Sequence, residues 1–173
     1  MVKLDPPFFL LAFFLIIASI KDCLSFRIPN WLTFPALATG IAYFSLTKGF
    51  EGFLFSLAGA LTGFALLIIP YMIGGSGAGD VKLLGAVGSF LGPKGVFSVF
   101  VLSCIFGGVY GLVLMASKGM LIDTCKRYVK ILKGFFITWQ FIYIPPSNKE
   151  RQLKICYGLA IALGTGSYLV FWV

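Results

Sequence analysis

The chain has 173 residues, of which 59% are hydrophobic and only 12% are charged, and its mean hydropathy is +0.98. A soluble domain of this length needs a polar, charged surface, and the chain has too few such residues to make one. The net charge of +8 requires no nucleic acid partner, because an unequal placement of lysine and arginine in membrane loops accounts for it.

The apolar residues fall in long runs, which are typical of membrane helices. A helix crosses the hydrocarbon of a bilayer with about 20 apolar residues, so the length permits about six crossings. A membrane β-barrel would show alternating segments of about ten residues, and the sequence has none. We therefore predict an all-α polytopic membrane helix bundle of about six transmembrane helices, with residues 1–173 forming one membrane-embedded domain.

The expected spans, in chain order, cover residues 8–20, 31–46, 53–73, 81–91, 96–116 and 153–173. The first run lacks a small-x-small cleavage site after it, and Lys3 before it is offset by Asp5, so we predict a retained membrane helix and not a signal peptide. The fourth run is too short to cross alone. We expect it to be a partial or tilted helix that continues toward Gly92 and Pro93.

Residues 117–152 form a basic segment that we expect on the cytoplasmic side. Its cations Lys126, Arg127, Lys130 and Lys133 recur at helical spacing between apolar residues. This pattern is typical of an amphipathic helix on anionic lipid, although a solvated helix has the same spacing.

The cations also predict the orientation of the bundle. With six crossings, three loops share one side and hold eleven cations, namely Lys21, Arg27, Lys82, Lys118, Lys126, Arg127, Lys130, Lys133, Lys149, Arg151 and Lys154. The opposite side has three, Lys3, Lys48 and Lys94. Because cytoplasmic loops carry the excess of lysine and arginine, the first group is predicted to face the cytoplasm, in the inner membrane of the cell.

Metal and cofactor sites are not expected. The chain has no histidine, and its four cysteines are isolated from one another. A structural zinc site needs four closely spaced ligands, and the sequence offers no such set.

Acidic residues are few enough to be considered one by one. Of the six, four have a surface explanation: Asp5, Glu51, Asp123 and Glu150. Asp22 and Asp80 remain, both next to predicted membrane helices, where an ionisable residue is costly and usually functional.

Asp22 and Asp80 each have a structural explanation as well. Asp80 directly follows the glycine-rich run 74–79. Such a run suits irregular chain at a water-filled cavity, but Asp80 would also serve as the N-cap of a helix starting at Val81. Asp22 would also serve as an interfacial acid neutralised by Lys21 or Arg27. The glycine run would equally fit a hinge in a transporter, whereas it lacks the Gly-Lys-Ser/Thr ending of a phosphate-binding loop.

Two motifs in order resemble the signatures of the type IV prepilin peptidase family, which are GxGD-type aspartic proteases. Asp22 is followed after five residues by Ile28-Pro29-Asn30. The second motif is Gly77-Ala78-Gly79-Asp80-Val81-Lys82-Leu83-Leu84. Similar stretches continue at 85–88 and 91–92 and in the last apolar run at 157–164, so the resemblance covers most of the chain.

The resemblance implies that Asp22 and Asp80 are the catalytic aspartates and that Gly77 and Gly79 support the loop presenting Asp80. It leaves the role of Lys82 open. It further implies an endopeptidase that removes a short basic leader from a prepilin-like membrane protein on the cytoplasmic side, without a cofactor. The implied partners are this substrate and the lipid bilayer, while the oligomeric state is not implied.

One departure from the longer family members concerns cysteine. Their cytosolic region with paired cysteines, associated with N-methylation, has no counterpart here. We therefore expect peptidase activity without methyltransferase activity, as in the short members that serve tight-adherence (Flp-type) pili. Two other hypotheses remain at this point: a proton-coupled transporter in which both aspartates relay protons, and a non-catalytic pilus assembly factor.

Overall fold

The computed structural model describes residues 6–73, 75–122, 124–126, 129 and 156–172. The chain divides into two compact units, Met1–Gly107 with Cys156–Val173, and Gly108–Ile155. Most of the predicted basic segment 117–152 lies outside the described residues. The first unit holds both candidate aspartates.

Helix α1 (Pro6–Ser25) is longer than the predicted run 8–20. It begins at a proline, which the first helical turn tolerates. Its buried positions recur every three to four residues, so they form one face of the helix; they are Pro7, Leu11, Leu15, Ala18, Ser19 and Asp22. The predicted run ended at residue 20 and so placed Asp22 after the helix. In the structure Asp22 belongs to the last turns of α1, on its buried face.

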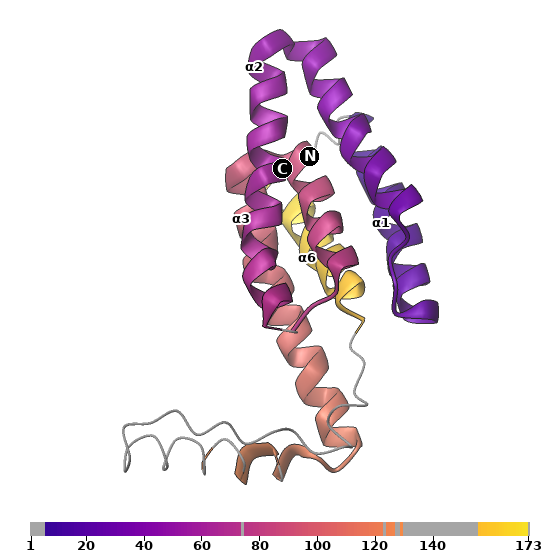
Figure 1. Cartoon of the computed structure of the whole chain (residues 1–173), viewed down its shortest axis with the longest axis vertical. Coiled ribbons are helices and arrows are strands. Elements are labelled where there is room, and N and C mark those ends of the chain that lie inside the picture. The colour runs from indigo at the N-terminus through magenta and orange to yellow at the C-terminus, as the bar shows by residue number, and fades with distance from the viewer. Residues whose placement is uncertain (1–5, 74, 123, 127–128, 130–155, 173) are drawn as a thin grey trace. The chain divides into compact units, whose positions relative to one another are not determined.

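Helix α2 (Asn30–Met72) contains the second predicted run and the third as far as Met72. Gly49 interrupts it with a non-helical backbone (φ 62°, ψ −142°), and Figure 1 shows the two limbs joined by a bend. The rings of Phe44 and Phe55, one from each limb, lie 5.3 Å apart. The two limbs thus fold back on each other.

Helix α3 (Ala78–Ser117) contains the fourth and fifth predicted runs. Gly92, at φ 70°, separates its limbs, and this left-handed backbone is one that glycine adopts without steric cost. The first limb is buried on nearly all sides, as expected for a helix in the centre of a bundle. The short fourth run is thus covered by neighbouring helices and not by lipid alone.

Small residues allow these helices to approach closely. A Cβ atom on Gly59 would collide with the carbonyl of Gly88, and one on Gly63 would lie 2.5 Å from the carbonyl oxygen of Leu84. The buried hydroxyl of Ser56 donates to the carbonyl of Ser89 at 2.7 Å. The second limb of α2 and the first limb of α3 are therefore in backbone contact.

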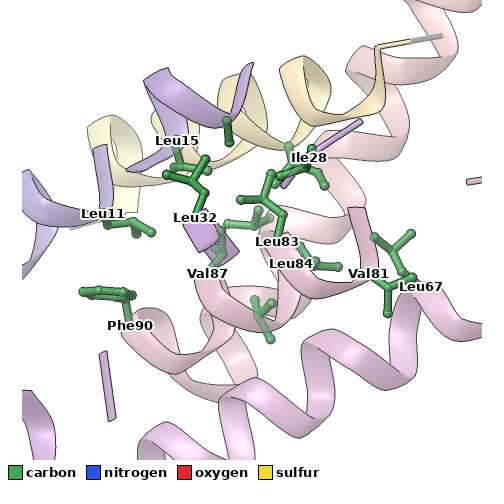
Figure 2. Close-up of a cluster of buried hydrophobic side chains, with 14 residues drawn as sticks. Leu11, Leu15, Ile28, Leu32, Leu67, Val81, Leu83, Leu84, Val87 and Phe90 are labelled. Carbon is green, nitrogen blue, oxygen red and sulfur yellow. The ribbon is translucent and has the colours of Figure 1, made fainter. Parts of the chain in front are cut away.

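Helix α6 (Tyr157–Trp172) packs against α1. The hydrophobic core joins residues of α1, α2, α3 and α6, and Figure 2 shows how their side chains gather. Its labelled members are Leu11, Leu15, Ile28, Leu32, Leu67, Val81, Leu83, Leu84, Val87 and Phe90.

By length and composition, α1, α2 and α3 are apolar enough to cross a membrane, and α6 is a shorter apolar helix. The prediction of an all-α membrane helix bundle is confirmed for the part of the chain that the structure describes. All six predicted runs are helical where they are described, apart from Ile73 and Cys156. The number of six crossings stays a prediction.

Candidate active site

Asp22 is held by the start of α6. Its side chain is 5% exposed, and its Oδ2 atom accepts a hydrogen bond of 2.8 Å from the backbone N–H of Gly158. A carboxylate at the first N–H groups of a helix is favourable, because these groups have no partner within the helix. This bond joins residues 136 positions apart in the chain.

Gly158 fits this role because it has no side chain. A Cβ atom there would lie 2.9 Å from Asp22 Oδ2 and 3.1 Å from Ile28 Cδ1. The sequence alone gave Gly158 no role beyond its place in the last apolar run. Its glycine identity was the only signal, and nothing in the spacing indicated which carboxylate its N–H would meet.

Asp80 lies in the first turn of α3 and is 7% exposed. Its Oδ2 accepts a hydrogen bond of 2.9 Å from the N–H of Gly77, and its own N–H donates to the Gly77 carbonyl at 3.1 Å. The acid at the third helical position thus caps the residue before the helix, as in half of a capping box. Asp80 is therefore not the N-cap of a helix starting at Val81, because the helix starts at Ala78.

Ile28 links the surroundings of the two aspartates. A Cβ atom on Gly79, the residue before Asp80, would lie 3.0 Å from Ile28 Cβ, and Ile28 also lies against Gly158. The side chain of Ile28 is 7% exposed. Ile28, the first residue of the Ile28-Pro29-Asn30 motif, therefore contacts both Gly79, which precedes Asp80, and Gly158, whose N–H binds Asp22.

The two carboxyl groups are near enough to interact. Asp22 and Asp80 repel each other electrostatically when both are charged, and Asp80 also interacts with the Tyr157 phenol. That phenol lies 3.6 Å from the Cys104 sulfur. Two acids that share a proton can act as general base and general acid in hydrolysis.

The remaining candidates from the sequence lie elsewhere or outside the described residues. Glu51 is exposed in α2, while Asp5, Asp123 and Glu150 are not described. In the described part of the chain, no group of three or more histidine, cysteine, aspartate or glutamate side chains is placed to hold a metal ion.

Lys82, whose role the sequence left open, donates a hydrogen bond of 2.8 Å from Nζ to Asn30 Oδ1. Both residues belong to the quoted motifs, but their contact was not foreseen. Spacing along the chain gives no measure of a contact between residues 52 positions apart.

Comparison with known proteins supports the resemblance. Residues 9–112 match the model of the type IV leader peptidase family, a region that contains both candidate aspartates. The prepilin leader peptidase/N-methyltransferase of Bacillus subtilis is 34% identical over 100 residues, covering 56% of this chain and 40% of that protein.

Similar proteins occur in other bacteria. The proteins of the same name from Aeromonas salmonicida and Xanthomonas campestris are 32% and 30% identical, covering 61% and 63% of this chain and 38% and 40% of their own lengths. The chain thus spans about two-fifths of the length of these relatives. No solved structure shows significant similarity to it. Because the family model matches more than half of its residues, this chain belongs to the type IV leader peptidase family.

Proposed function

We propose that this protein is a membrane aspartic endopeptidase that removes the short basic leader from type IV prepilin-like precursors. The observation that carries the proposal is the pair formed by Asp22 and Asp80. Both are buried, each is held by one backbone N–H, and they come from helices that begin more than 70 residues apart. The family match and the names of the relatives favour a peptidase over other uses of two buried acids.

Hydrolysis by this pair follows from sharing one proton between two carboxyl groups. The ionised carboxylate takes a proton from water as the water oxygen attacks the scissile carbonyl, and the protonated carboxyl group donates to the carbonyl oxygen. In the second step a proton passes to the amide nitrogen, the C–N bond breaks, and a carboxylic acid and an amine result. No cofactor enters this scheme.

The hydrogen bonds support this scheme by leaving acceptor capacity free. Each aspartate uses its Oδ2 to accept one backbone hydrogen bond, and an ionised carboxylate accepts at both oxygens. Each carboxyl group therefore keeps an oxygen for water or for the peptide carbonyl while its orientation is fixed.

The proposed side of cleavage is the cytoplasm. Lys21, Arg27 and Lys82 lie within a few residues of the candidate pair, whereas Lys48 and Lys94 lie next to the interruptions at Gly49 and Gly92. The positive-inside rule assigns the richer group to the cytoplasm. The apolar helix of the precursor would then stay in the lipid while its basic leader reaches the aspartates.

Co-expression with a prepilin tests the proposal. Wild type, Asp22→Asn and Asp80→Asn are expressed with a candidate precursor, and removal of the leader is followed by the shift of the precursor on a gel. Each carboxamide keeps the shape of the side chain but exchanges no proton, so we expect at least about a thousandfold loss of the processing rate, within the range for removal of one essential acid–base group.

Glu51→Gln is the matched control, because it makes the same chemical change at an exposed acid. It is expected to process the precursor at the normal rate. Normal processing by either aspartate variant, at equal protein level in the membrane, would falsify the assignment of that residue.

A further inference from the structure

The contact between Lys82 and Asn30 joins the starts of two helices. Lys82 lies two residues after Asp80 in the first turns of α3, and Asn30 is the first residue of α2. The ammonium group donates to Asn30 Oδ1 at 2.8 Å, and it lies 5.3 Å from the centroid of the Phe34 ring. One cation thus contacts two side chains on successive turns of α2.

Leu32 and Thr33 are buried near the start of α2, so packing holds this helix end and a polar contact adds to it. Its N-cap, Pro29, makes no side-chain hydrogen bond to the first N–H groups of the helix, a position where serine, threonine or aspartate would normally supply one. Asn30 is exposed. The bond from Lys82 is a polar contact that ties this helix end to α3.

Fixing the start of α2 also fixes Ile28, two residues earlier. Ile28 packs against Gly79, the residue before Asp80, and against Gly158, whose N–H binds the Asp22 carboxylate. A shift of Ile28 would change the space between Gly79, which precedes Asp80, and Gly158, which binds Asp22. The path from Lys82 to the aspartates thus consists of one hydrogen bond and two packing contacts.

We propose that Lys82 is a positioning residue, which holds Asn30 and Phe34 so that Ile28 keeps Asp22 and Asp80 at their working separation. This inference rests on the proposed peptidase function. A lysine that only set membrane topology, or only bound lipid headgroups, would depend on its charge and not on Asn30. The dependence on Asn30 therefore separates the two roles.

A double-mutant cycle tests the coupling. The purified protein is assayed on a prepilin with Lys82→Met, Asn30→Leu and the double variant. Since Lys82 touches neither aspartate, each single change is expected to lower kcat about fivefold, the scale of one typical net hydrogen bond, because solvent weakens this exposed contact. KM is expected to stay unchanged. The kcat of the double variant is expected to be no lower than the kcat of the less active single variant.

Two further variants give the controls. Asn30→Asp retains an acceptor for the ammonium group and is expected to keep the wild-type kcat. Lys94→Met removes an exposed cation from the same helix and is expected to change neither constant. The proposal would be overturned if the fold-loss in kcat of the double variant equalled the product of the two single losses. A normal kcat in Asn30→Leu would also overturn it.

Hydrogen exchange measures the same contact without catalysis. Amide exchange in residues 31–34 is expected to rise about fivefold in Lys82→Met and in Asn30→Leu alike, and to be unchanged in Lys94→Met. If the wild-type protein cleaves no precursor, the proposed function fails while this measurement still decides whether Lys82 holds the start of α2. Unchanged exchange in both variants would reject the positioning role by itself.

Discussion

Adding a single methyl group at Gly158 is expected to displace the Asp22 carboxylate. In Gly158→Ala the new Cβ atom would lie 2.9 Å from Asp22 Oδ2, 3.2 Å from Asp22 Cβ and 3.1 Å from Ile28 Cδ1. Ordinary van der Waals contact starts at 3.4 Å, so the carboxylate must retreat by about 0.5 Å. The same movement strains the 2.8 Å bond from the Gly158 N–H.

The size of the effect follows from that bond and from the geometry of the pair. A hydrogen bond to a charged group contributes about 1.5–3 kcal/mol, which corresponds to a factor of about ten to a hundred in rate if it is lost from the transition state. Misplacing a catalytic group by about 1 Å costs about a hundredfold. We therefore expect Gly158→Ala to lower kcat by at least about tenfold, with little change in KM.

The assay is single-turnover cleavage of a prepilin by purified protein, with thermal unfolding in detergent measured in parallel. Gly166→Ala is the matched control in the same helix, because among the described residues no group packed against this position lies within 4 Å of the added Cβ. Ile28→Val removes the crowded Cδ1 atom, so combining it with Gly158→Ala is expected to recover part of the lost kcat. A normal kcat in folded Gly158→Ala would refute the idea that Gly158 positions Asp22.

Two more substitutions test the neighbouring contacts. Gly79→Ala places a Cβ atom 3.0 Å from Ile28 Cβ and 3.3 Å from its backbone N and O, which cannot rotate away, so kcat should fall about tenfold; an unchanged kcat would contradict this packing. Gly88→Ala drives a Cβ atom into the carbonyl of Gly59 and should destabilise the fold by about 1–3 kcal/mol, seen as a lower unfolding midpoint. Gly166→Ala should leave that midpoint unchanged or slightly raised, and equal midpoints for both alanine variants would speak against the close helix approach.

Much of the fold follows from composition and the length of apolar runs. Runs of this length cannot be placed in water, and a helix satisfies its own backbone groups in lipid, so the helical segments could be predicted within a few residues. The largest differences are at helix ends. Helix α1 continues through Asp22 to Ser25, and α3 already begins at Ala78, because hydropathy falls at a polar residue even where the backbone remains helical.

The short fourth run shows a second kind of difference. On length alone, residues 81–91 are too few to cross a bilayer. In the structure this stretch is the buried first limb of α3, surrounded by other helices. Burial by protein, which hydropathy does not distinguish from burial by lipid, explains how so short a helix remains inside.

The sequence by itself determined the membrane class, the helical segments and, through elimination and two motifs, the candidate pair Asp22 and Asp80. Only the tertiary structure decided which groups hold them. Nearly every residue has a backbone N–H, so the sequence does not show which N–H binds which carboxylate. The bond from Gly158 to Asp22 spans 136 residues and the bond from Lys82 to Asn30 spans 52. Both exist because helix packing brings distant helix ends together, and packing is a property of the whole set of side chains and not of any single segment.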